Sequence, residues 1–245
     1  MSGHSKWSTI KHQKGATDAA RAQIFTKLAN AITIAVRAGG GIADPGDNIK
    51  LRLAIEKARA ANMPKANIER AIDRATGKLA GAAQLEEIIY EGFGPGGAAV
   101  LVEAVTDNKQ RTAAAIKNSF AKHGGNLGSS GSVAYLFEKV GMITVNKTTT
   151  PDSQLEAIME SGATDFTETE TEYALFTQPK DLHQIKSELE KRGFTIVENE
   201  LTFKPTTTVT IGETSGKAAL LALFEVLEQL EDVHKVHTNA EIIHS

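Results

Sequence analysis

The chain has 245 residues, of which 41% are hydrophobic, and its formal net charge is −3; this length indicates two or three folded domains. The lack of cysteine excludes disulfides, thiol nucleophiles, zinc ribbons and iron–sulfur clusters. Because no apolar run approaches the about 20 residues that span a bilayer and no signal-peptide pattern is present, we expect a cytoplasmic protein with no membrane partner.

The first 27 residues form a basic arm whose only acid is Asp18. Clustered lysines and arginines displace the counterions that surround phosphates, and the aromatic ring of Trp7 could stack on an unpaired base. We therefore predict that the arm contacts nucleic acid; the alternative is that Trp7 packs on the protein and the lysines remain in water. The cations of the arm are Lys6, Lys11, Lys14, Arg21 and Lys27.

Three helical patterns follow within residues 1–78. Apolar residues recur every three or four positions from 16 to 38 and stop at Gly39-Gly40-Gly41. A second pattern follows residues 44–47, and a third begins near Asn62, has Pro64 in its first turn and ends at Gly77. We predict a small helical domain over residues 1–78, which holds 14 basic and 6 acidic residues (+8), against 13 and 24 (−11) in residues 79–245.

Short β-branched runs replace the helical pattern after Gly81. Residues 87–91 and 98–105 flank a glycine-rich turn and predict a β-hairpin. The turn, Gly92 to Gly97, has the G-x-G-x-x-G spacing of dinucleotide-binding loops, but a strand follows it where that site needs a helix. A helix with Asp107 at its start then continues to residue 122, and a strand is predicted at 133–137.

Residues 141–203 have the order βαββαβ, with strands expected at 142–145, 165, 173–176 and 194–203, which is typical of a ferredoxin-like domain. The tail predicts a strand, an apolar helix and a strand at 233–236. The middle and tail segments each leave an apolar sheet face uncovered. We therefore predict an α+β protein of three domains, a helical domain followed by two ferredoxin-like α/β domains. Residues 1–78 form the helical domain, residues 79–140 plus 204–245 form the discontinuous second domain, and residues 141–203 form the third domain, inserted in the second.

Other motifs do not indicate catalysis. The Gly/Ser stretch at 123–132 lacks a P-loop ending, and we interpret it as a connector rather than as a contact loop that offers amides to phosphate. His234 and His237 point to opposite faces of a strand and cannot bind one metal ion together there. No catalytic triad, H-E-x-x-H helix or nucleophile elbow occurs. We expect no enzyme activity, cofactor or metal.

Several long motifs resemble the YebC/PmpR family. They are Gly3-His4-Ser5-Lys6-Trp7, Ile10-Lys11-His12, Phe25-Thr26-Lys27-Leu28, Tyr90 to Gly97, Thr106-Asp107-Asn108-Lys109-Gln110-Arg111-Thr112, and Gly124 to Gly128 through Gly131 to Phe137. The resemblance implies a three-domain regulator of gene expression that is not an enzyme. Bacterial members are commonly assigned as DNA-binding transcriptional regulators, mitochondrial relatives activate translation, and some bacterial members are linked to ribosomes slowed at proline-rich stretches.

Three functions remain open from the sequence. The first is a regulator that binds DNA; the second is a ribosome-associated translation factor that contacts ribosomal RNA; the third is a scaffold whose acidic domains bind protein. No helix-turn-helix with a readable recognition helix is evident, which favours contacts to phosphates over base reading. The oligomeric state is open. The candidate nucleic-acid-binding residues are Lys6, Trp7, Lys11, His12, Lys14, Arg21, Lys27, Lys109 and Arg111.

Overall fold

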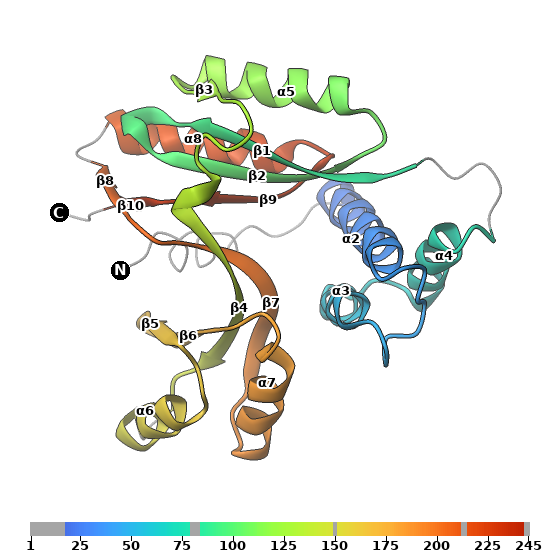
Figure 1. The fold of residues 1–245 in the computed structure, drawn as a ribbon, viewed down its shortest axis with the longest axis vertical. Helices are drawn as coiled ribbons and strands as arrows, with labels where there is room; N and C mark the ends of the chain where they lie inside the picture. The colour runs from blue at the N-terminus through green and yellow to red at the C-terminus, as the bar shows by residue number, and fades with distance from the viewer. Residues whose placement is uncertain (1–17, 79–83, 149–150, 212–214, 243–245) are drawn as a thin grey trace. The chain divides into compact units, whose positions relative to one another are not determined.

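A computed structural model describes residues 18–78, 84–148, 151–211 and 215–242 (Figure 1). Three helices come first along the chain, and two four-stranded sheets with their helices follow. The predicted fold class is therefore confirmed: the protein is α+β, with a helical N-terminal region before its sheet-containing parts. None of the described helices is long and apolar enough to cross a membrane.

The helical region consists of α2 (Asp18–Ala38), α3 (Ile49–Ala60) and α4 (Lys65–Ala75). Helix α2 ends because Gly40 adopts a left-handed conformation with φ of 70°, after which Gly41 donates its backbone N–H to the carbonyl of Val36 over 2.9 Å. Helix α3 begins at Asn48, whose side chain accepts the N–H of Leu51. These three helices lie where the sequence pattern predicts them.

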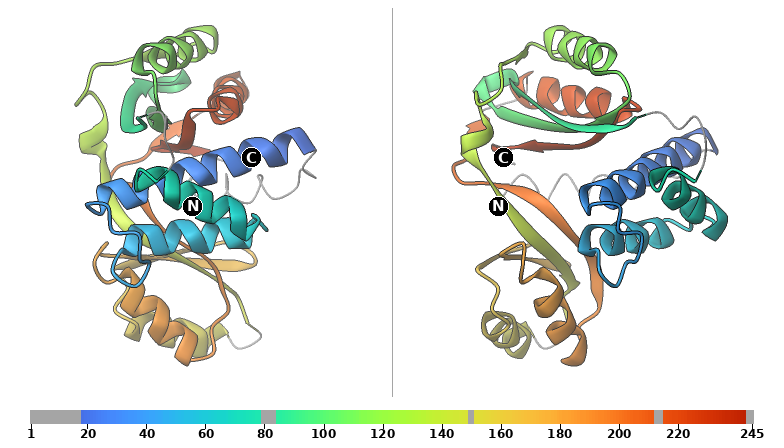
Figure 2. Two further views of the ribbon diagram at one scale, coloured as in Figure 1. Left: turned by 90° about the vertical axis from the view of Figure 1, so that its right-hand side faces the viewer. Right: turned by 45° about the vertical axis from the view of Figure 1, so that its right-hand side comes forward.

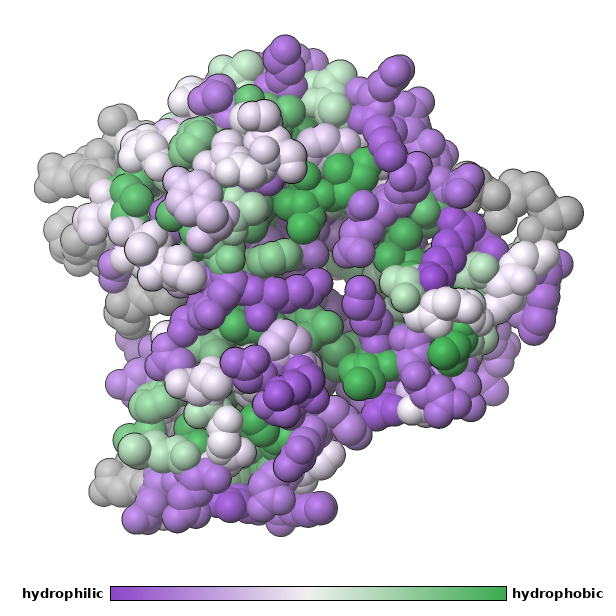
Figure 3. Space-filling view, in the orientation of Figure 1, coloured by the Kyte–Doolittle hydropathy of each residue, from purple (hydrophilic) through white to green (hydrophobic). Residues whose placement is uncertain are grey.

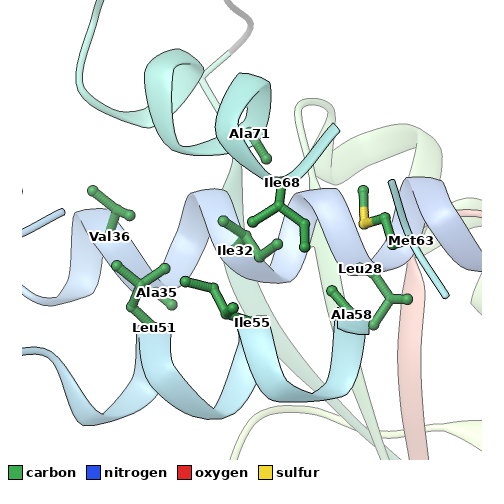
Figure 4. Packing of buried hydrophobic residues seen from close by; sticks show 10 residues of the cluster. All are labelled: Leu28, Ile32, Ala35, Val36, Leu51, Ile55, Ala58, Met63, Ile68 and Ala71. Carbon is green, nitrogen blue, oxygen red and sulfur yellow. The ribbon is translucent and has the colours of Figure 1, made fainter. Parts of the chain in front are cut away.

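Apolar faces of the three helices meet in one core, in which α2 lies between α3 and α4 (Figure 4). Thr33 of α2 is fully buried in this core, and its hydroxyl donates to the carbonyl of Ala71 in α4 over 3.2 Å. The packing therefore fixes the positions of both outer helices on α2. The core residues are Leu28, Ile32, Ala35, Val36, Leu51, Ile55, Ala58, Met63, Ile68 and Ala71.

The first sheet has the strand order β3-β1-β2-β9. The antiparallel β1–β2 hairpin pairs Glu86 with Thr106 at its open end and Phe93 with Ala99 at its turn. Strand β9 comes from the tail of the chain, so segments on both sides of residues 137–205 build one sheet. The elements are β1 (Glu86–Phe93), β2 (Ala99–Thr106), α5 (Lys109–Lys122), β3 (Asn126–Leu127), α8 (Ser215–Gln229) and β9 (Val233–Thr238), with the short helix η1 (Pro95–Gly97) in the hairpin turn.

Helices α5 and α8 pack beside each other on one face of this sheet (Figure 1). Gly92 lies on β1 and Gly94 follows the end of the strand in an extended conformation, so the two residues face the same side. A Cβ atom at Gly92 would lie 2.8 Å from the ring of Phe120 in α5, and one at Gly94 would lie 2.9 Å from Leu220 in α8. The glycines of the G-x-G-x-x-G spacing thus allow the two helices to approach the strand.

The second sheet has the strand order β5-β6-β4-β7, which is the ferredoxin-like arrangement predicted from the βαββαβ pattern. Helices α6 and α7 connect strands of this sheet (Figure 2). The surface over these two helices is mostly hydrophilic in the view of Figure 3. The elements are β4 (Phe137–Asn146), α6 (Pro151–Glu160), β5 (Asp165–Glu168), β6 (Glu172–Thr177), α7 (Leu182–Lys191) and β7 (Ile196–Pro205). A separate parallel pair joins β8 (Val209–Ile211) to β10 (Ala240–Ile242).

Two local predictions were wrong. The strand expected at 133–137 is mostly the short helix η2 (Ala134–Leu136), and only Phe137 belongs to β4, the strand that also contains the one expected at 142–145. The N-cap of α5 is Asn108 rather than Asp107, because the Asn108 side chain accepts the N–H of Arg111 over 3.0 Å. Asp107 instead pairs with the Arg111 side chain one turn later.

The described residues form two compact units. One contains residues 18–78, 84–133 and 215–236, and the other contains residues 134–148, 151–211 and 237–242. The helical region and the first sheet therefore belong to the same unit, in which α2 contacts β2. The boundaries predicted for three domains stay a prediction.

Candidate nucleic-acid interface

Five of the predicted binding residues lie outside the described residues. They are Lys6, Trp7, Lys11, His12 and Lys14 of the basic arm. Their part in binding stays a prediction from the sequence. The described part of the arm begins at Asp18, so Arg21 and Lys27 are the members whose positions the structure gives.

Arg21 and Lys27 lie about 1.7 turns apart on α2 and have different surroundings. Arg21 is exposed and has no hydrogen-bond or ion-pair partner among the described residues. The Lys27 ammonium donates to the carbonyl of Glu228 over 2.6 Å, and Gln23 donates to the carbonyl of Gln229. Both acceptors are at the C-terminal end of α8, where carbonyls lack intrahelical partners and a cation is favourable. Lys27 thus joins α2 to α8, whereas Arg21 faces solvent.

Lys109 and Arg111 at the start of α5 both form ion pairs with acidic residues. The Lys109 ammonium lies 2.6 Å from the carboxylate of Glu86. The Arg111 guanidinium lies 3.0 Å from Asp107 and 3.0 Å from Asp232, and the hydrogen bond to Asp232 is the main cause that raises the pKa of Arg111. The structure therefore places these two predicted site residues in ion pairs within the sheet-containing part of the unit.

Asp232 is the centre of a polar cluster that joins α5 to the segment before β9. Its carboxylate accepts from Arg111 and, over 2.6 Å, from the hydroxyl of Thr112. Thr112 is 1% exposed, and its hydroxyl also lies 2.8 Å from that of Thr106. Because buried hydroxyls need hydrogen-bond partners, this cluster explains the polar residues at the start of α5 without a ligand.

The Gly/Ser stretch at 123–132 is held by a carboxylate of the protein itself. Glu91 on β1 is 5% exposed, and its two carboxylate oxygens accept the N–H groups of Gly131 and Val133 over 2.6 and 2.8 Å. The backbone carbonyl of Glu91 also accepts the N–H of Gly128 over 2.8 Å. Two amides that a phosphate would need thus already bind an internal anion, which supports the interpretation of this stretch as a connector.

The two tail histidines have separate environments on β9. The ring of His237 lies edge-on to Phe203 with a centroid distance of 5.3 Å. Burial, and next the positive charge of Lys27, lower the pKa of His234 to about 4, and its Nε2 atom has no hydrogen-bond partner among the described residues. Within the part of the chain that the structure describes, no group of three or more His, Asp or Glu side chains could hold a metal ion.

Four further cations of the helical region were missed by the sequence analysis. Like Arg21, they have no side-chain hydrogen-bond or ion-pair partner among the described residues. The signal was present in the charge of +8 over residues 1–78, but we attributed it mainly to the arm. These cations are Lys50 and Arg59 of α3 and Arg70 and Arg74 of α4.

Comparisons with known proteins cover almost the whole chain. A family model described as the TACO1/YebC protein N-terminal domain matches residues 5–78, and a model described as the TACO1/YebC second and third domain matches residues 85–240. The first match ends where the helical region ends. The second spans both four-stranded sheets.

Individual relatives are similar over nearly their full lengths. A protein of Persephonella marina named "probable transcriptional regulatory protein" is 49% identical over 99% of this chain and 96% of its own length. A protein with the same description from Desulfotalea psychrophila is 48% identical over the same shares. The crystal structure of a conserved hypothetical protein from Aquifex aeolicus matches with a TM-score of 0.87 and 45% identity, covering 96% of each chain.

Proposed function

We propose that this chain, which belongs to the TACO1/YebC family, is a non-enzymatic regulator of gene expression that binds nucleic acid through its basic N-terminal region. The observation that carries the proposal is the set of unpaired cations on the described helices, namely Arg21, Lys50, Arg59, Arg70 and Arg74. Unpaired cations attract phosphates and release counterions on binding. The relatives named as probable transcriptional regulatory proteins support the same function.

The charge distribution favours contact through the N-terminal region alone. Residues 79–245 carry 13 basic and 24 acidic residues, and their cations Lys109 and Arg111 are paired with acids. A duplex that lay across this part would meet net negative charge. We therefore expect the nucleic acid to contact the arm and the helical region, with Lys6, Lys11, Lys14 and Arg21 on phosphates and Trp7 as a stacking group.

Two alternatives differ in the partner. A translation factor would bind ribosomal RNA, and the excess of positive charge in the N-terminal region suits a contact with one RNA surface of a ribosome. A protein-binding scaffold would instead use the acidic remainder of the chain. Deletion of residues 1–78 is a poor test of the scaffold, because Gln23 and Lys27 hydrogen-bond to α8 within one compact unit. Charge variants leave that unit complete.

The test is a charge reversal in the arm with a matched reversal elsewhere. We expect the double variant Lys11→Glu and Lys14→Glu to weaken binding to nucleic acid and to make it less dependent on salt. The control is Lys180→Glu with Lys191→Glu, which changes the net charge equally at two lysines near and on α7. Binding of duplex DNA is measured by mobility shift, and co-migration with ribosomes is measured in a sucrose gradient of lysate at two salt concentrations.

The outcomes separate the alternatives. Salt-sensitive co-migration with ribosomes that the arm variant loses and the control keeps supports the translation factor. Loss confined to duplex DNA supports the transcriptional regulator. Equal binding by the wild type and the arm variant removes the arm from the mechanism. If the wild type binds neither duplex DNA nor ribosomes, the protein-binding scaffold is the alternative that remains.

A further inference from the structure

The basic and acidic residues in the middle of helix α4 lie on two different flanks of the helix. An α-helix turns by about 100° per residue, and the helix faces α2 through Ile68 and Ala71 (Figure 4). Arg70 lies about 200° from Ile68, on the outer side of the helix, and Arg74 lies one turn further along the same flank. The acids Glu69 and Asp73 lie together on the neighbouring flank.

The two flanks differ in how their charges are satisfied. Lys65 lies 3.5 Å from Glu69, and Lys78 lies 3.2 Å from Asp73. Each acid of α4 thus has a lysine partner. Arg70 and Arg74 have no side-chain hydrogen-bond or ion-pair partner among the described residues, and they are four residues apart. Like charges at this spacing repel each other, so the pair gains no stability from its own neighbouring positions on the helix.

We propose that Arg70 and Arg74 form a phosphate-binding pair that engages the sugar–phosphate backbone of a nucleic acid. This inference rests on the proposed function and extends it to a defined pair of residues on α4. Two phosphodiester groups, one bound by each guanidinium, neutralise the repulsion between the two side chains. The planar guanidinium also forms two parallel hydrogen bonds with phosphate oxygens, which explains arginine rather than lysine on this flank.

The scaffold beneath the pair is well suited to binding. Ile68 is 6% exposed, Ala71 is 3% exposed, and the carbonyl of Ala71 accepts the hydroxyl of the fully buried Thr33. The backbone of α4 is therefore fixed on α2. Binding has to order only the two side chains, which reduces the entropy lost on association.

The test compares two double variants of the full chain with the same change in net charge. Arg70→Gln with Arg74→Gln removes the unpaired cations, and Lys65→Gln with Lys78→Gln removes two cations of the same helical segment that have acid partners. The probes are duplex DNA and duplex RNA of one sequence and about 20 base pairs. The dissociation constant is measured from about 50 to 200 mM salt.

The expected result follows from counterion release. Each lost phosphate contact reduces the slope of log affinity against log salt by about 0.9 on duplex DNA, so the arginine variant has a slope smaller by about 1.8. Over this fourfold range of salt, its affinity falls about 12-fold less than that of the wild type. The lysine control keeps most of the wild-type slope. The probe on which the difference is found identifies DNA or RNA as the source of the phosphates.

A second measurement distinguishes binding from a structural role. The repulsion between the arginines and the favourable position of Arg74 in the last turn of α4 are similar in size and opposite in sign. Their replacement should therefore change the thermal midpoint of unfolding by only a few degrees, whereas loss of a structural pair would lower it by more. The inference is overturned if the wild type binds and the arginine variant keeps the full slope, or if the lysine control loses as much slope as the arginine variant. A wild type that binds neither duplex overturns the inference, and it refutes the proposed function itself if the protein also fails to co-migrate with ribosomes.

Discussion

Burial of a single imidazole makes the stability of this protein depend on pH. His234 on β9 has a pKa lowered to about 4, first by burial and then by Lys27; Lys57 lowers it further, whereas Glu103 and Asp232 act in the opposite direction. The imidazole is neutral in the folded protein at neutral pH. Its Nε2 atom has no hydrogen-bond partner among the described residues, so no acceptor there holds an added proton.

We predict that the protein loses about 2 kcal/mol of stability between pH 7 and pH 5 through His234. The unfolded imidazole, with its ordinary pKa of 6.5, takes up a proton in this window, while the folded one does so only near pH 4. Falling pH therefore favours the unfolded state. Urea unfolding at the two pH values measures the difference. His234→Phe should abolish it, whereas the exposed His183→Gln should retain it; an unchanged pH dependence in His234→Phe contradicts the assignment.

The glycines of the hairpin are explained by the packing of whole elements against it rather than by the properties of single residues. The spacing from Gly92 to Gly97 matches a phosphate-binding loop, yet the strand faces two helices that lie too close for side chains at Gly92 and Gly94. A Cβ atom at Gly92 would lie 2.7 Å from the carbonyl oxygen of Asn126, in addition to its conflict with Phe120. At Gly94 the nearest atom is the flexible end of Leu220.

The two glycines should therefore differ in their tolerance of alanine. We expect Gly92→Ala to destabilise the protein by about 3 kcal/mol and Gly94→Ala by about 1 kcal/mol, because overpacking against backbone cannot be relieved by a rotamer change. Chemical unfolding measures both values, and nucleic-acid affinity should not change when the variants are folded. The reverse order of stability would contradict the packing explanation.

At the scale of the whole molecule, charge is divided between the two ends of the sequence. Residues 1–78 carry +8 and residues 79–245 carry −11. Within the described residues, the helical region leaves cations unpaired, whereas Lys109 and Arg111 satisfy Glu86, Asp107 and Asp232. The position of a cation in the sequence therefore matters less than the acids that surround it in the fold.

This division of charge predicts that Lys109 and Arg111 contribute to the stability of the protein but not to its binding of nucleic acid. The variant Lys109→Gln with Arg111→Gln should keep the wild-type salt slope for nucleic acid, because both cations are already neutralised by the protein. It should unfold at a lower urea concentration, because Asp232 loses one of its hydrogen-bond donors. Salt titration and urea unfolding of the same preparation test both parts. A slope reduced by about 1.8, as expected for two lost phosphate contacts, would contradict this prediction and show that Lys109 and Arg111 contact the nucleic acid.

Much of the fold could be predicted because it depends on local signals. Helix α2 has a regular apolar period and a glycine stop, and the βαββαβ order predicts the second sheet. The prediction failed where a local signal was ambiguous: residues 134–136 were expected in a strand but form η2, and Asp107 was taken as the cap that Asn108 provides. For the candidate site, the five residues outside the described part stay a prediction. The ion pairs of Lys109 and Arg111 could not be predicted, because the pairing of a charge is not a local property.

The sequence by itself determined the fold class, the family resemblance and the excess of positive charge at the N-terminal end, since periodicity, motifs and composition are all read along the chain. The tertiary structure decided which cations are available, because it brought Lys109 to Glu86, Arg111 to Asp232 and Lys27 to the end of α8. It also decided that the Glu91 carboxylate accepts hydrogen bonds from two backbone amides in and just after the Gly/Ser stretch. Each of these contacts joins residues distant in sequence, and only the packing of the elements brings such residues within hydrogen-bonding distance.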